Sequence, residues 1–171
     1  TAVISDLQDI NPIIITGANP ATANNLQIGA TGQNWAICNA TQPYEVSINN
    51  LGGNVTTAND KVYVHLPADI AIVANSFSST SANTAGMNPV PVVSNVAGLT
   101  RYCWQLPAGV AINDPMSFSF DIEHTGTLMA GQSYEVITQT VTEVVSICAS
   151  TQDTCSVDMM TGELIDTIHV S

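Results

Sequence analysis

The chain has 171 residues, of which 45% are hydrophobic and only 9% are charged, against roughly 25% charged residues in ordinary soluble domains. Two basic residues, Lys61 and Arg101, stand against fourteen acidic ones, so the net charge is −12. This balance argues against nucleic acid and anionic lipid as partners, because no cationic patch is present to displace phosphate counterions. No apolar run reaches the roughly 18 residues of a membrane span, so no membrane insertion is expected.

The first residues, TAVISDLQDI, lack a basic region followed by an apolar core, and no initiator Met is present. We therefore expect a processed protein or a segment of a longer one. The length suits one domain over residues 1–171. Asn, Thr, Ser and Gln supply most of the polarity, which is typical of β-rich exported proteins and predicts an extracellular or cell-surface location.

Short runs that alternate between apolar and polar residues predict strands with one buried face. Near the start the candidates are IIIT (13–16) and NWAIC (34–38). The run 43–50 places Tyr44, Val46 and Ile48 on one face. The run 61–66 places Val62, Val64 and Leu66 inward, and Lys61, Tyr63 and His65 outward.

The second half of the chain continues this pattern. The run 116–123 places Met116, Phe118, Phe120 and Ile122 inward. Residues 134–148 predict one long strand or two strands divided by a bend, and residues 163–170 predict another strand. Gly, Pro, Asn and Asp clusters separate the runs, and residues 75–88 are expected to form a long exposed loop or a weakly paired edge. The whole predicts an all-β, antiparallel β-sandwich of eight to eleven strands.

One phrase occurs twice, as HLPADIAI (65–72) and QLPAGVAI (105–112). Proline cannot donate to a sheet ladder, so each Leu-Pro is expected to end a strand. No further copy appears at the same period, so we interpret the two phrases as two corners at sheet edges and not as a repeat.

Two longer stretches, YEVSINNLGGNVTTANDKVYVHLPADIAI and YCWQLPAGVAINDPMSFSFDIEHTG followed by MAGQSYEVITQTV, carry a resemblance. They resemble the conserved repeat domain found in tandem in large bacterial cell-surface proteins, including adhesins of gliding and type 9-secreting bacteria. The resemblance covers roughly residues 44–148 and not residues 1–39, which either complete this sandwich or add to a neighbour. It implies an immunoglobulin-like sandwich, a surface location, a spacer or adhesive role and no enzyme activity.

The four cysteines form no C-x-x-C or Cys/His motif, so zinc is not expected. An even number in an exported β-rich chain favours disulfides. Cys148–Cys155 is preferred because a turn-forming STQDT lies between them, which leaves Cys38–Cys103. Four free thiols are the alternative.

The candidates for chemistry are few. His65, His124 and His169 belong to no catalytic motif, and we expect no enzyme and no cofactor. Calcium is the one candidate metal, with oxygen ligands at Asn59-Asp60, Asn113-Asp114 and Asp153, although no EF-hand loop is present. Asn39 and Asn54 stand in N-x-[ST] sequons and are candidate glycosylation sites.

Lys61, the single lysine, is a candidate for an isopeptide crosslink to Asn but is expected to be solvated. Trp35, Tyr102 and Trp104 form a candidate ligand platform. On a regular strand Cys103 and Trp104 cannot both face the core, and a core Trp104 is the preferred alternative.

These observations predict a non-catalytic structural module of a surface adhesin or filament. Neighbouring copies or domains of the same protein are its expected partners, with host or environmental surfaces as a further class. Strand-like sequence in residues 1–7 and 163–171 suggests that one of these segments completes a neighbouring subunit. The alternatives are a carbohydrate- or calcium-binding module of a secreted protein, and a viral capsid or decoration protein.

Overall fold

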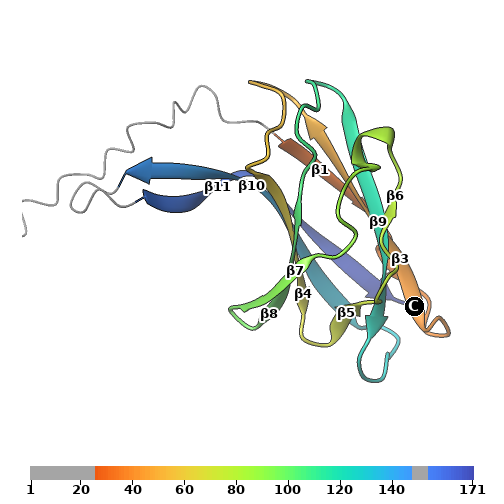
Figure 1. Cartoon of the computed structure of the whole chain (residues 1–171). Helices are drawn as coiled ribbons and strands as arrows, with labels where there is room; N and C mark the ends of the chain where they lie inside the picture. The colour runs from red at the N-terminus through yellow and green to blue at the C-terminus, as the bar shows by residue number, and fades with distance from the viewer. Residues whose placement is uncertain (1–25, 148–153) are drawn as a thin grey trace, which may run out of the picture.

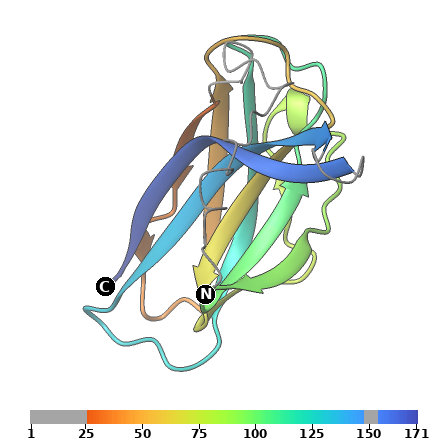
Figure 2. The ribbon, with the colours of Figure 1, turned by 90° about the vertical axis from the view of Figure 1, so that its left-hand side faces the viewer.

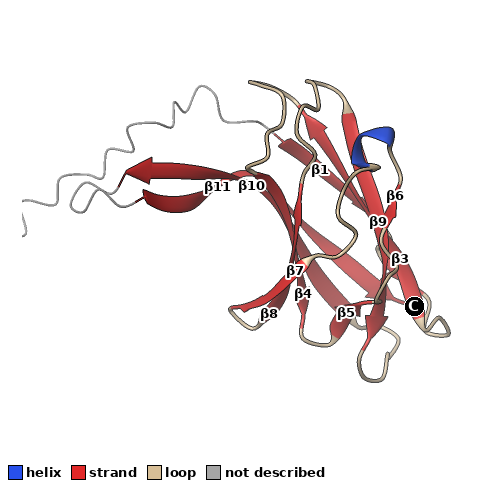
Figure 3. Cartoon of the chain, viewed as in Figure 1, coloured by secondary structure: helices blue, strands red, loops and turns tan. Residues whose placement is uncertain are grey.

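The computed structural model describes residues 26–147 and 154–171. In this part of the chain Figure 3 shows strands joined by loops, with one short 3-10 turn at Ala82–Thr84. The strands are β1 (Leu26–Thr31), β2 (Asn34–Trp35), β3 (Thr41–Asn50), β4 (Asp60–Pro67), β5 (Ile70–Ile72), β6 (Ser78–Ser79), β7 (Val92–Val96), β8 (Leu99–Gln105), β9 (Pro115–His124), β10 (Ser133–Ile147) and β11 (Thr154–Val170). The predicted all-β sandwich of eight to eleven strands is confirmed.

The strands form two sheets that pack face to face (Figure 1). The first sheet has the order β1-β3-β9-β5, and β6 also pairs with β9. The second has the order β2-β11-β10-β4-β8-β7. All pairings are antiparallel except that of β2 with β11. In Figure 2, β1 lies at one side of the sandwich and β7 at the other.

The core follows the two-residue alternation of the sequence. The inward residues of β3, β4 and β9 that the alternation predicts are all at most 1% exposed. Trp104 of β8 joins them at 2% exposure and lies over Phe118 and Phe120, with ring centroids 5.4 and 5.6 Å away. The core position of Trp104 is therefore confirmed, and Cys103 faces the opposite side of the second sheet.

Both Leu-Pro phrases are corners of the architecture. Leu66 and Leu106 are buried where β4 and β8 of the second sheet end. From each corner the chain crosses to the first sheet, into β5 after Pro67 and toward β9 after Pro107. Proline suits this position because the strand needs no further amide donor there.

β10 is one continuous strand, and with β11 it forms the longest hairpin of the fold (Figure 1). The pairing of β10 with β4 ends at Thr142, opposite Asp60. Residues 144–147 and 154–157 lie beyond this point and pair with each other; we call them the arm. In Figure 1 the arm projects from the side of the sandwich.

Several sequence-based expectations are revised. NWAIC contributes only the two residues of β2. In residues 75–88 the expected weakly paired edge is found, because the two-residue strand β6 pairs with β9 there. Residues 163–170 are part of β11, between β10 and β2, so this segment is already paired within its own chain. The segment 13–16 and residues 1–7 lie outside the described residues. Residues 26–39 belong to the same sandwich as the rest.

Candidate functional site

The exposed apolar surface is concentrated at the β7 edge. Among the described residues eleven large hydrophobic side chains are exposed, and four of them fall between positions 90 and 96: Val90 at 66%, Val92 at 72%, Val93 at 56% and Val96 at 39%. β7 pairs with β8 on one side only, because it is the last strand of its sheet. Proteins usually protect such edges with charge, proline or a covering loop.

The sequence around β7 carries no charge. Between Asp69 and Arg101 the chain has no Asp, Glu, Lys, Arg or His. β7 and β8 are joined by a tight turn at Ala97 and Gly98, which have φ values of 51° and 83°. Such turns match the twist of a hairpin, so β7 is held as a regular strand up to its end. The edge is therefore a regular strand with no charged residue, and proline stands only before its start, at Pro89 and Pro91.

A groove runs beside β7, where the two sheets separate at this side of the sandwich. Its volume is about 390 Å³. The loop after β5, including Phe77, forms one wall, and Pro91 and Val93 form the other, while Tyr102 and Trp104 form the floor. The groove is thus lined mainly by apolar and aromatic side chains, which is typical of sites that receive an apolar group.

Trp104 has a second feature that bears on the groove. Its indole Nε1 is fully buried and has no hydrogen-bond partner among the described residues. Buried indole N–H groups usually find an acceptor. Tyr102, the neighbouring floor residue, accepts a hydrogen bond on its hydroxyl from the amide of Ile72 at 3.3 Å.

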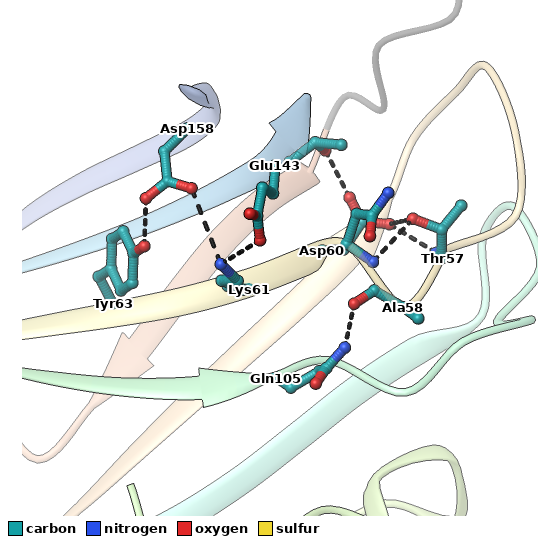
Figure 4. Close-up of polar contacts among 10 residues, drawn as sticks. Thr57, Ala58, Asp60, Lys61, Tyr63, Gln105, Glu143 and Asp158 are labelled. Atoms are coloured by element: carbon teal, nitrogen blue, oxygen red, sulfur yellow. Dashed lines mark hydrogen bonds and ion pairs between the residues drawn. The ribbon is translucent and has the colours of Figure 1, made fainter. Parts of the chain in front are cut away.

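The outer face of the second sheet carries a polar cluster around Lys61 (Figure 4). Lys61 Nζ lies 2.6 Å from Glu143 Oε2 of β10 and 3.9 Å from Asp158 Oδ1 of β11. Tyr63 of β4 donates its hydroxyl proton to Asp158. We call Lys61, Tyr63, Glu143 and Asp158 the lysine cluster. It joins β4 to the base of the arm.

The electrostatics of this cluster favour the charged pair. The hydrogen bond with Glu143 raises the pKa of Lys61, although partial burial opposes it. Burial, and then the hydrogen bond with Asp158, raises the pKa of the Tyr63 hydroxyl. Lys61 is therefore ion-paired and not simply solvated as expected. The intact mass of the protein still tests the predicted absence of an isopeptide crosslink.

The outward residues Tyr63 and His65 are buried, contrary to expectation. Each is only 7% exposed. The Arg101 guanidinium lies 4.6 Å from the centroid of the Tyr63 ring, and His65 Nδ1 lies 3.3 Å from the carbonyl of Ile137. Burial lowers the pKa of His65. Side chains from neighbouring strands thus cover the middle of this sheet face.

The other two histidines lie at strand ends. His124 Nε2 is 2.8 Å from the Tyr134 hydroxyl, and His124 Nδ1 accepts a hydrogen bond from the amide of Gly126. His169 Nδ1 is 3.1 Å from Ser133 Oγ. Within the described part of the chain, each histidine thus has its own local partner, and the three lie at separate places in the fold.

The calcium candidates differ in their surroundings. Asp60 is fully buried, and its carboxylate accepts hydrogen bonds from the amide and hydroxyl of Thr57 and from the hydroxyl of Thr142 (Figure 4). It therefore fixes the loop before β4 to β10. Asn113 and Asp114 are exposed in a turn, and Asp153 lies outside the described residues. No group of three or more His, Cys, Asp or Glu side chains is placed to hold a metal in the described part of the chain.

The predicted disulfide between Cys38 and Cys103 is not supported, because both are free thiols. Cys38 is exposed in the turn after β2, whereas Cys103 points out from β8, opposite Tyr63. The outward direction follows from the inward direction of Trp104. Burial raises the pKa of the Cys103 thiol, which makes it a poor nucleophile. The pair Cys148–Cys155 is not tested, because Cys148 lies outside the described residues.

The two sequon asparagines, Asn39 and Asn54, both stand at exposed positions, so glycosylation remains a prediction. Trp35 is fully buried at the far side of the sandwich from β7, and its indole donates to the carbonyl of Asn39. The three aromatic residues proposed as a platform therefore do not come together on a surface: Tyr102 and Trp104 form the groove floor, and Trp35 is part of the core elsewhere.

The comparisons with known proteins identify the fold. No family model matches the chain, and no curated protein matches it. A cohesin module from a Clostridium perfringens family 33 glycoside hydrolase is similar in structure, with a TM-score of 0.51 and 9% identity over 88% of this chain and 98% of that chain. This likeness shows a β-sandwich fold and nothing more.

Two further solved structures have lower scores. The collagen-binding domain of a Staphylococcus aureus adhesin has a TM-score of 0.47 and 8% identity, over 83% of this chain and 96% of that chain. A non-cellulosomal cohesin from Archaeoglobus fulgidus has a TM-score of 0.46 and 12% identity, over 86% and 91%. Within the described residues, no helix has the length and apolar character needed to cross a membrane.

Sequence reasoning missed the groove and the exposed edge. The phrase NPVPVVSNVAGLT contains the sequence signal for the exposed edge, because it is an apolar, uncharged run followed by a turn. It does not alternate cleanly, and so its place at the end of a sheet follows only from the topology.

Proposed function

We propose that this protein is a non-catalytic structural module of an extracellular assembly, an adhesin or a filament, and that its β7 edge receives a strand from a neighbouring copy or domain. The observation that carries the proposal is the combination of an uncharged apolar edge strand with the groove beside it. An added strand would satisfy the open amides and carbonyls of β7 and cover its valines.

The extracellular location is supported by composition. Uncharged polar residues dominate, and both basic residues make contacts on one sheet face: Lys61 with two carboxylates, Arg101 with the Tyr63 ring and with Ser94. The resemblance of residues 44–148 to the conserved repeat domain of bacterial surface proteins points the same way.

The test is a pair of lysine substitutions at exposed valines. Val92→Lys places a charge on the β7 edge, and Val55→Lys adds the same charge on the loop between β3 and β4. Edge lysines are a common protection against strand addition. We expect sedimentation to show assembly for the wild type and Val55→Lys but not for Val92→Lys. Equal assembly of the two variants would contradict the proposal, as would a wild type that stays monomeric at all concentrations.

Calcium titration separates this function from a calcium-binding module. The structural proposal expects the melting temperature to stay constant as calcium is added, since binding to the folded state would raise it. A saturable rise in melting temperature would favour the calcium-binding alternative.

A further inference from the structure

The groove beside β7 sets requirements for the strand that it receives. An apolar cavity of about 150 Å³ holds a benzene molecule, so a groove of about 390 Å³ has room for two aliphatic side chains. Alternate residues of a strand face the same side. The occupant is therefore expected to be a short β-branched run with apolar residues at positions i and i+2.

The net charge of the protein adds a second requirement. Each copy carries −12, so copies repel one another unless they meet through uncharged surfaces. On the groove side the chain is uncharged between Asp69 and Arg101. The occupant should likewise come from an uncharged part of the chain.

One segment outside the described residues meets both requirements. Residues 13–16 read Ile-Ile-Ile-Thr, and no charged residue occurs between Asp9 and Glu45. The other two strand-like segments fit less well. Residues 1–7 contain Asp6, and residues 163–170 are already held within β11.

The topology favours a second copy as the source of this segment. β1 is an edge of the first sheet next to β11, whereas β7 is at the opposite side of the sandwich (Figure 2). A donor at one side and an acceptor at the other give a head-to-tail contact, which repeats along a filament.

We propose that residues 13–16 of one copy add as a strand to the β7 edge of the next copy, with Ile13 and Ile15 seated in the groove against Val93 and Trp104. This inference rests on the proposed function, strand addition at β7, and names the segment that supplies the added strand. Ile14 points to the other face of the added strand.

The experiment uses the full chain with single changes on either side of the contact. On the donor, Ile13→Asp and Ile15→Asp place a charge in the groove, and Ile14→Asp is the matched control. On the acceptor, Val93→Lys blocks the groove, and Val55→Lys is its control. We expect the two groove-directed donor variants and Val93→Lys to be monomeric by sedimentation, and Ile14→Asp to lose less affinity.

Mixing provides the positive test. A Val93→Lys copy keeps an intact donor, and an Ile13→Asp/Ile15→Asp copy keeps an intact groove. Their mixture should form one-to-one dimers and nothing larger. A synthetic peptide of residues 9–20 should also bind the Ile13→Asp/Ile15→Asp protein in calorimetry, and the additional change Val93→Lys should abolish this binding.

The outcomes separate this inference from the proposed function. If Val92→Lys prevents assembly and the donor variants do not, β7 receives a different strand and only this inference fails. If neither Val92→Lys nor the donor variants prevent assembly, the proposed function and this inference both fail. Binding of the peptide to a protein whose wild type is monomeric would mean that the segment closes onto its own chain, which overturns the second copy. Equal losses for Ile13→Asp and Ile14→Asp would overturn the seating in the groove.

Discussion

At the scale of single residues, Gly162 shows how closely the two sheets approach. β10 and β11 shift register between Thr140 and Val141, so Thr161 is an extra residue and Gly162 follows it. A Cβ at Gly162 would lie 2.1 Å from the carbonyl oxygen of Leu26 in β1. The absence of a side chain at this position therefore lets β1 pack directly against β11 at Gly162.

Gly162→Ala should destabilise the protein by about 1–3 kcal/mol or more, because the backbone of β1 must move to avoid the new methyl group. Chemical denaturation measures this as a lower midpoint at constant slope. Gly52→Ala is the control, since a Cβ there meets nothing within 4 Å, and it should leave the midpoint unchanged. A midpoint for Gly162→Ala equal to that of Gly52→Ala would contradict the close approach.

His65 gives the molecule a dependence on pH. Burial holds its pKa below the ordinary value, with Arg101 adding to the effect, while the Ile137 carbonyl and Glu163 oppose it. Protonation therefore favours the unfolded chain, so stability present above about pH 6.5 is lost as the pH falls toward the pKa of the folded state. The melting-temperature advantage of the wild type over His65→Gln should shrink between about pH 7.5 and 5. An advantage that stays constant over this range would show that His65 does not titrate in this way.

At the scale of elements, the arm depends on its attachment to β4. Lys61→Met removes the pairs with Glu143 and Asp158. Relative to the wild type, we expect it to accelerate hydrogen exchange of the amides in residues 144–147 and 154–157, and to leave exchange in β3 and β9 nearly unchanged. The loss of global stability should stay near 1 kcal/mol or less, because these side chains are about a quarter to a third exposed. Lys61→Arg keeps the charge and should keep most of the protection. Uniform acceleration across all strands would contradict a local role.

The sequence predicted the elements better than their surroundings. Alternation identified the inward residues of β3, β4 and β9 because burial on one face needs only local spacing. The burial of Tyr63 and His65 on the other face was missed because Arg101, Asp158 and the carbonyl of Ile137 come from other strands. β6 and β2 are too short to show any period, and the groove exists only where β5 and β7 end their sheets.

At the scale of the whole molecule, net charge should control assembly. Copies with a charge of −12 repel each other at low ionic strength, and salt screens this repulsion over a Debye length of about 10 Å at 0.1 M. Because the proposed contact is apolar and uncharged, added sodium chloride should strengthen assembly in sedimentation experiments. Weaker assembly at higher salt would indicate that ion pairs hold the copies together.

The positions of Leu26 and Ser171 decide how the sandwich responds to stretching. Leu26 pairs with Asn50 at the end near the arm, whereas Ser171 is bonded to Trp35 and Ile37 at the opposite end. Tension between these two points slides β1 along β3 and β11 along β10 and does not peel either strand from its neighbour. Ladder bonds between antiparallel strands lie across the strands, so sliding loads them all together. The domain should therefore yield only at high force along this axis.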